Sequence, residues 1–485
     1  MSCALTDNVL VKSCYNSLLE HILSQANGPI RCDNFLELNQ GGERLIRIRG
    51  KIYSGYEQYD ELVIYKGKVI FIGSQHQGEH SIKSLNMNSV VEEIVLKPEQ
   101  CVVPGFILPK IDLGTGLTVS NWLHLGPFGM HGAWHHPIPN YNLNYLAKAI
   151  TYFDRSLRDN NWLLGYGLDL NLLSCLPWSE KRDESFLTFI DGLKLARPVC
   201  IFEKSGKKAF INTLAATAIF LNFTELERAF FPDLRSFIRF IETEKGIRSS
   251  HFEWFTGAVE EGKVSDANKS IILTLDRFKA EALKWGITSF GINEPPSLYT
   301  LIKQHFYPIN VVNTEVIEQN DDDILFVYPD NNDFDGYYLR QKGSLDRLKT
   351  HLSLHSRRVL NRLVCGCEFP NRPLGTIRFL KHVVKCTTLI APDEFNATQR
   401  SLLSDEKLTI KDALCCMTVN AGSLLNKGGV LGTLNIGANA DFLVLSHDLI
   451  AFPETLDALC IEQTWIAGEC RYENENLRSN SLVNG

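Results

Sequence analysis

The stretch VPGFILPKID, residues 103–112, decides the fold of this chain. It is an apolar run that begins with a Pro-Gly pair and ends in two charged residues, Lys110 and Asp112. A short apolar run next to turn residues is typical of a strand buried on both faces of a parallel sheet. The run therefore predicts a buried strand that leads into two charged side chains.

The bulk composition describes a large, ordinary globular protein. The chain has 485 residues, of which 44% are hydrophobic and 22% charged, and this length fits one large domain with a smaller satellite. A net charge of −7 gives no field that would favour nucleic acid or an anionic membrane. Thirteen cysteines without paired Cys-x-x-Cys motifs predict reduced thiols in the cytoplasm. We see neither a signal peptide nor the ~20 apolar residues that cross a bilayer.

Strand patterns gather near both ends of the chain. Residues 45–74 contain alternating apolar and polar runs, and a hairpin is predicted around Lys66-Gly67. Residues 441–468 contain a buried-strand run and a second strand that a glycine ends. Two distant all-β blocks predict one small β-sandwich domain built from both chain ends, residues 44–104 and 426–473.

The middle of the chain alternates short apolar runs with longer helical patterns, which favours a parallel α/β domain. We assign this domain to residues 105–425, with an insert at about 130–275. Residues 1–43 are predicted to form a helical extension, and residues 474–485 a flexible tail.

Several segments of the chain resemble those of one family, in the same order. They are GKIYSG (50–55), KGKVIFIG (66–73), VPGFI (103–107), WLLGYGLD (162–169), RPVCIF (197–202), SGKKAFIN (205–212), GITS (286–289), GCEFP (366–370), 408–425 and 432–445. Together they resemble the amidohydrolase superfamily, and within it the amidohydrolase 3 branch that includes enzymes like N-substituted formamide deformylase. The resemblance implies a distorted (β/α)8 TIM-type barrel beside a β-sandwich, with chemistry at the carboxyl ends of the barrel strands. Residues 297–361 are shorter than the family's corresponding run, so a shortened or irregular barrel is expected.

The resemblance also implies a divalent metal, such as zinc, that activates water for hydrolysis of C–N bonds. In the family, the first strand ends in His-x-His, and these histidines bind the metal. Lys110 and Asp112 stand at these two positions here. Lys207 replaces the histidine of the family's Ser-Gly-His, and Glu368 replaces the aspartate of its Gly-Ser-Asp-Phe-Pro.

Two interpretations of these substitutions remain open. Lys110 and Asp112 either handle protons together or neutralise each other where the metal was. Lys207 puts an amine where the family has an imidazole. Glu368 either acts as a general base or pairs as a relic with one of the lysines.

A histidine-rich loop offers an alternative metal site. His131, His135 and His136 lie on a Gly/Pro-rich stretch that follows the first strand. Their spacing is compatible with metal ligation but also with surface or substrate-loop positions, so they are weak candidates.

Three hypotheses follow. The chain is a degenerate amidohydrolase that lacks the inherited metal site and acts as a pseudoenzyme or in binding. Alternatively, it is an active amidohydrolase for a small amide or N-acyl substrate, with a site remodelled around Glu368 and Asp112. A divalent metal is expected only if the site is remodelled in this way. The third hypothesis is a different barrel enzyme. A small amide-type molecule is the expected ligand, and the oligomeric state stays open, with a homodimer among the options.

Overall fold

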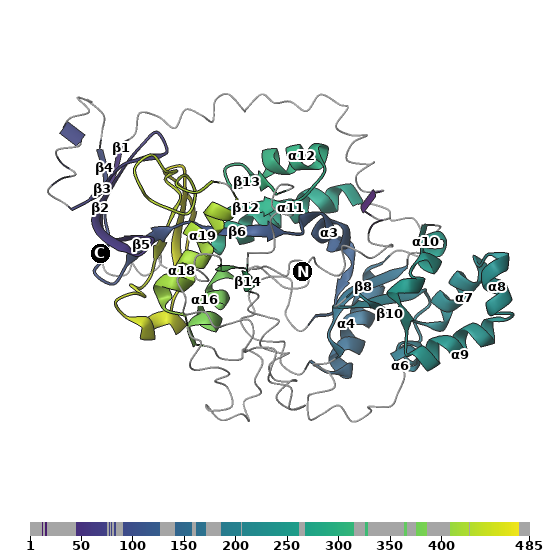
Figure 1. Cartoon of the computed structure of the whole chain (residues 1–485). Helices are drawn as coiled ribbons and strands as arrows, with labels where there is room; N and C mark the ends of the chain where they lie inside the picture. Colours follow the sequence, from purple (N-terminus) through teal and green to yellow (C-terminus); the bar gives the residue numbers. More distant parts are fainter. Residues whose placement is uncertain are drawn as a thin grey trace. The chain divides into compact units, whose positions relative to one another are not determined.

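The computed structural model describes residues 12, 15–16, 45–74, 77, 79, 82–83, 91–126, 141–157, 162–170, 186–204, 206–260, 267–314, 325–327, 363–365, 375–385, 408–425 and 427–474. Most of the predicted N-terminal extension, and the tail beyond residue 474, lie outside these residues. The chain divides into two compact units (Figure 1). Unit 1 consists of Met1–Gln25, Asp112–Leu275 and Glu368–Pro373, and unit 2 of Ala26–Ile111, Asp276–Cys367 and Leu374–Gly485.

Unit 2 contains an eight-stranded sheet that draws on both ends of the chain. Its order is β18-β17-β16-β5-β1-β2-β3, with β4 paired to β1. The two ends meet where β16 pairs antiparallel with β5, with Phe442 opposite Pro104. The strands are β1 (Leu45–Ser54), β2 (Glu57–Tyr65), β3 (Lys68–Gly73), β4 (Val91–Val95), β5 (Cys101–Pro104), β16 (Phe442–Leu445), β17 (Ile461–Ile466) and β18 (Glu469–Glu473). One sheet thus unites the two sequence blocks, while the face-to-face packing of a sandwich stays a prediction.

The predicted hairpin around Lys66-Gly67 is confirmed. Tyr65 pairs with Lys68, which leaves a two-residue turn, and both turn residues have positive φ, 49° and 71°. This backbone matches the twist of the flanking strands, and glycine adopts it without steric cost. Buried aliphatic and aromatic side chains of the β1, β2 and β16 strands, among them Ile48, Leu62 and Phe442, form the core of the sheet.

Unit 2 also contains two parallel sheets. The first has the order β13-β12-β6, from β6 (Phe106–Ile111), β12 (Ile287–Ile292) and β13 (Asn310–Asn313). The second pairs β14 (Leu325–Val327) with β15 (Leu363–Cys365). Helix α12 (Pro296–Phe306) connects β12 to β13, as parallel pairing requires. The remaining helical elements of this unit are α16 (Thr376–Lys385), α18 (Ile410–Met417), α19 (Val419–Leu424) and η5 (Pro453–Asp457), and α11 (Ala267–Lys284) begins in unit 1 and ends in unit 2.

Unit 1 is built on a mixed five-stranded sheet of order β11-β10-β9-β8-β7. Strands β7 (Leu123–His124), β8 (Leu163–Leu168) and β9 (Val199–Glu203) are parallel, whereas β10 (Lys208–Ile211) and β11 (Ile247–Arg248) continue antiparallel. The helical elements are α3 (Leu113–Thr118), η1 (Val119–Asn121), α4 (Leu143–Ser156), α6 (Phe186–Gly192), α7 (Thr213–Leu221), α8 (Glu225–Phe230), α9 (Leu234–Glu244), η2 (Ser249–His251) and α10 (Glu253–Glu260). Helices α4 and α6 lie between successive parallel strands in the chain, which is a βαβ pattern.

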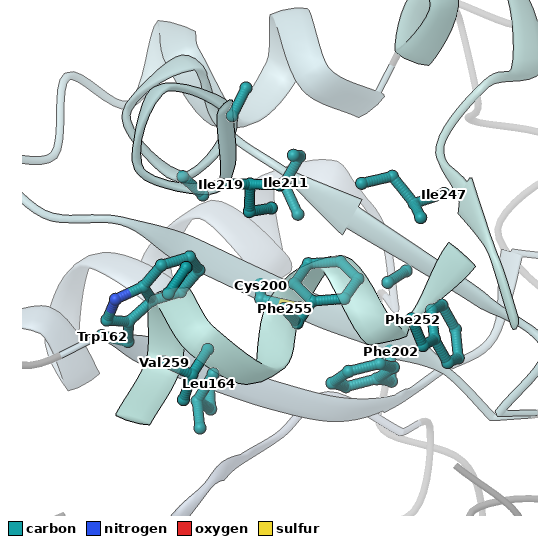
Figure 2. Packing of buried hydrophobic residues seen from close by; sticks show 14 of the residues in the cluster. Trp162, Leu164, Cys200, Phe202, Ile211, Ile219, Ile247, Phe252, Phe255 and Val259 are labelled. Atoms are coloured by element: carbon teal, nitrogen blue, oxygen red, sulfur yellow. The ribbon is translucent and has the colours of Figure 1, made fainter. Parts of the chain in front are cut away.

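An aromatic and aliphatic core holds unit 1 together. Phe202 of β9 is fully buried, and its ring centroid lies 5.7 Å from that of Trp122 and 5.3 Å from that of Phe252. Figure 2 shows Ile211 and Ile219 in the same cluster. Ring pairs at these separations add to the free energy gained by burial. This core holds strands β8 and β9 in place.

Outside the eight-stranded sheet, eight described strands take part in parallel pairs. They belong to three separate sheets, so the closed barrel stays a prediction, while the α/β class is confirmed. Within the described part of the chain, we find no helix with the length and hydropathy to span a bilayer.

Candidate functional site

Lys110 lies half-buried near the carboxyl end of β6 in unit 2. The pairing of β6 with β12 slips by one residue here, because Leu108 stands opposite Phe290 but Ile111, not Lys110, stands opposite Ile292. Such a bulge reverses the alternation of side chains and re-aims the residues that follow it. Lys110 therefore lies within this irregular stretch of β6.

Asp112 caps a helix in unit 1. It is the N-cap of α3, and its Oδ1 accepts a hydrogen bond from the Thr115 backbone N–H at 3.0 Å. A capping carboxylate satisfies one of the unpaired N–H groups in the first turn of a helix. The sequence predicted that this carboxylate handles protons or neutralises Lys110. One of its oxygens accepts the hydrogen bond that caps the first turn of α3.

Lys207 is exposed in the turn that precedes β10. Its backbone carbonyl accepts a hydrogen bond from the Ser249 N–H at 2.9 Å, next to the pairing of β10 with β11. The roles predicted for Lys110, Asp112 and Lys207 stay predictions.

The other predicted site residues, Glu368, His131, His135 and His136, lie outside the described residues. Among the residues that are described, three or more His, Cys, Asp or Glu side chains nowhere gather as a metal site would require.

A further group of polar side chains lies at the carboxyl ends of β7, β8 and β9 in unit 1. The sequence analysis did not predict this group. His124 ends β7, Asp169 follows β8, and Lys204 follows β9. The Lys204 Nζ lies 3.1 Å from the Asp169 Oδ2. Parallel α/β folds place ligands at this edge of the sheet. The position of Asp169 directly after an apolar run was the available signal.

A second bulge sets the direction of Asp169. Gly165 stands opposite Ile201, but Leu168 stands opposite Glu203, so β8 contains one extra residue. Gly167 lies within this bulge with a φ of +81°, which glycine adopts without strain. The chain then carries Asp169 into the protein, where 1% of it is exposed.

Tyr141 ties the carboxyl ends of β7 and β8 together. Its hydroxyl donates to the Leu125 carbonyl at 2.6 Å and accepts from the Asp169 N–H at 3.1 Å. Burial raises the pKa of the Tyr141 phenol well above its ordinary value, so the hydroxyl keeps its proton and remains a donor. The Leu125 carbonyl and the Asp169 N–H at these strand ends therefore both have a hydrogen-bond partner.

Unit 2 also has polar side chains at the carboxyl end of its parallel sheet. Glu294 follows β12 and is 6% exposed, and Thr314 follows β13 and is 3% exposed. The Thr314 N–H donates to the Ile292 carbonyl at 2.8 Å, which extends the pairing beyond β13. Sequence reasoning missed Glu294, although an acidic residue two positions after an apolar run indicates such a position.

Comparison with known proteins identifies the last part of the chain. Residues 389–472 match the sequence model of a group described as the Amidohydrolase family. This segment is similar to the amidohydrolase family. It contains α18, α19, β16 and β17 of the described structure. The amidohydrolase 3 assignment made from the sequence is thus confirmed, whereas the likeness to deformylases stays a prediction.

Solved structures similar to this chain include a metal-dependent hydrolase and a guanine deaminase. An uncharacterized metal-dependent hydrolase from Pyrococcus horikoshii OT3 is 15% identical, with 84% of this chain and 99% of that chain covered and a TM-score of 0.49. Guanine deaminase from E. coli is 13% identical, with 89% and 99% covered and a TM-score of 0.34. TM-scores below 0.5 assign no activity to this chain. No curated protein matches the sequence significantly.

Proposed function

We propose that this amidohydrolase-family protein no longer holds a metal through the inherited residues and that it binds a small amide-type molecule instead of hydrolysing it. The observation that supports the proposal most directly is the chemistry at the end of β6. The family's two histidines are replaced by Lys110 and Asp112, and Asp112 caps α3.

These residues do not fit a divalent cation. A lysine ammonium has three donors and no lone pair, so it offers a metal nothing to coordinate and adds a repelling charge. A zinc site needs neutral imidazoles, thiolates or carboxylates at about 2.0–2.3 Å from the ion. The Asp112 Oδ1 that would supply one such contact already accepts the Thr115 N–H.

The alternative is an active amidohydrolase whose site is remodelled around Glu368 and Asp112. A carboxylate at a strand end is suited to general-base chemistry, and Asp112 keeps a second oxygen beside the one that caps α3. In this case the protein would need a metal or another electrophile to polarise the amide.

Elemental analysis of purified protein and an amidase assay separate the two. The proposal predicts far less than one equivalent of zinc or another transition metal per chain after incubation with the ion and desalting, and no turnover of N-acyl or formamide substrates. A stoichiometric metal together with turnover would contradict it. In that event Glu368→Gln should abolish turnover without lowering the melting temperature, and Glu99→Gln, at an exposed position, serves as the control.

A further inference from the structure

Helix α8 of unit 1 exposes apolar side chains to solvent. It lies between α7 and α9 in the chain (Figure 1), and none of its residues is buried. Leu226 and Phe230 are 72% and 73% exposed. They are four positions apart and therefore share one face of the helix, which the exposed Ala229 extends. Single exposed apolar side chains are common, whereas a group of them on one face indicates an interaction site.

Polar contacts, rather than burial, hold α8 in its helical conformation. A helix this short has little stability of its own. Thr224 and Glu227 form a capping box at its beginning. At the other side of the helix, the Arg228 guanidinium donates to the Phe223 carbonyl at 3.2 Å and to the Leu221 carbonyl at 3.3 Å. These contacts turn the arginine toward α7 and leave the apolar face of α8 open.

The preceding helix, α7, exposes leucines as well. Its sequence, TLAATAIFL, is apolar on nearly all sides, which is typical of a helix that is covered on all sides. Ala215, Ala216 and Ile219 are buried on the inner side. Leu214 and Leu221 are seven positions apart, so they share the outer side, and they are 44% and 67% exposed. The composition of α7 therefore indicates a cover that the described part of this chain does not supply.

Charges of both signs lie at the two ends of α8. Glu225 begins the helix, Arg235 follows it in the first turn of α9, and both are exposed. The carboxylates of Glu227 and Asp233 accept capping hydrogen bonds within the chain. Opposite charges at the two ends suit a second copy of this chain, because a two-fold axis brings the acidic end of one helix to the basic end of the other. A partner with charge of one sign would be repelled at one end.

We propose that the outer face of α7 and α8 is the contact between two copies of this chain, with the two α8 helices antiparallel about a two-fold axis. In this arrangement Leu226 of one copy packs against Phe230 of the other, and symmetry repeats the contact. The small Ala229 between them lets the two helices approach closely. Glu225 of each copy then faces Arg235 of the other at the rim of the contact.

The size of this surface predicts a weak dimer. Helices α7 and α8 contain nine and six residues, whereas a standard interface involves about 20–30 residues and ~800 Å² on each side. Interfaces below this size belong to transient complexes. We therefore expect a dissociation constant on the order of 10 μM, so the chain is a monomer when dilute and a dimer when concentrated.

Sedimentation velocity of the full chain in reducing buffer, over a series of ~1–200 μM, measures the dissociation constant. Leu226→Glu/Phe230→Glu puts charged side chains into the apolar contact and should leave only monomer over this range. Both positions are exposed, so the melting temperature of the dilute protein should not change. Tyr152→Glu, at a position on α4 that is 79% exposed, should dimerise as the wild type does.

A charge swap tests the antiparallel arrangement. Glu225→Arg and Arg235→Glu each bring like charges together across the two-fold axis, and each should raise the dissociation constant about fivefold. The double variant Glu225→Arg/Arg235→Glu restores opposite charges in the dimer. Its dissociation constant should therefore return to within about twofold of the wild-type value.

The inference is wrong if the wild-type chain stays monomeric throughout the series, whether or not the surface takes up another protein or a membrane. A dimer that persists in the Leu226→Glu/Phe230→Glu variant would place the contact elsewhere and overturn it too. So would a charge-swapped double variant that dimerises no more tightly than the single variants. If Leu226→Glu/Phe230→Glu does not fold, Leu226→Ser/Phe230→Ser makes the same test with neutral side chains.

Discussion

Asp441 should make the stability of unit 2 fall as the pH rises. The residue is 4% exposed, and burial raises its pKa from 3.8 to about 6. Its Oδ1 accepts from the Ala467 N–H at 2.8 Å and its Oδ2 from the Asn310 amide at 2.9 Å, which offsets the effect of burial only in part. The carboxylate thus links the β-sheet to the parallel sheet of the same unit.

The magnitude follows from the two pKa values. Between them the folded protein keeps a proton that the unfolded chain has lost, so the contribution is complete below the unfolded value and lost as the pH rises through about 6. The full difference of about two pKa units corresponds to ~3 kcal/mol. Between pH 4.5 and pH 7.5, where the comparison is practical, ~2 kcal/mol should be lost.

Asp441→Asn removes this titration while other groups continue to titrate. Urea unfolding of the wild type and the variant at both pH values gives the free energy of unfolding. The substitution should cost ~2 kcal/mol more at pH 4.5 than at pH 7.5. Asp60→Asn, at an exposed position on β2, should show no such difference. An equal cost of Asp441→Asn at the two pH values would refute the reasoning.

Three further substitutions test single contacts through the free energy of unfolding in urea. Tyr141→Phe leaves a buried carbonyl and a buried N–H without their partner, so a loss of ~2–4 kcal/mol is expected. Glu61→Ala should cost ~1–3 kcal/mol, because Arg47 would lose its buried partner but keep Glu79 and Glu93 at 3.5 and 3.6 Å. Gly167→Ala should cost ~1–3 kcal/mol through its positive φ, while Gly192→Ala, which has open space around it, should cost nothing.

The tyrosine and glutamate substitutions also have control substitutions of the same residue type. Tyr145→Phe changes a half-buried tyrosine on α4, and Glu99→Ala an exposed glutamate, and neither should cost more than ~0.5 kcal/mol. If Tyr141→Phe costs no more than its control, the hydroxyl does not tie the strand ends together. A cost of Glu61→Ala within the range of Glu99→Ala would show that the buried ion pair contributes little.

Local patterns in the sequence predicted the features that depend on a few neighbouring residues. Lys66-Gly67 predicted a hairpin because a two-residue turn with positive φ needs glycine, and the turn has that backbone. The buried run after Asp441 predicted a strand for the same local reason, and Phe442–Leu445 is β16. β16 pairs with β5, so strands from both chain ends share one sheet, while the composite β domain stays a prediction.

Features that depend on long-range geometry were beyond such reasoning. Asp112 was considered only as a site residue, although its spacing to Thr115 is that of an N-cap. The pair of Asp169 and Lys204 went unnoticed, because their approach depends on a bulge in β8 and on the register with β9. Register between strands distant in sequence is not visible in either strand alone.

The most direct test of the central claim is a crystal soaked in Zn²⁺ and measured at the zinc absorption edge. The account predicts no anomalous peak between the carboxylates of Asp112 and Glu368. A peak at about 2.0–2.2 Å from an oxygen of each would contradict it, because the inherited position would then still hold a metal ion.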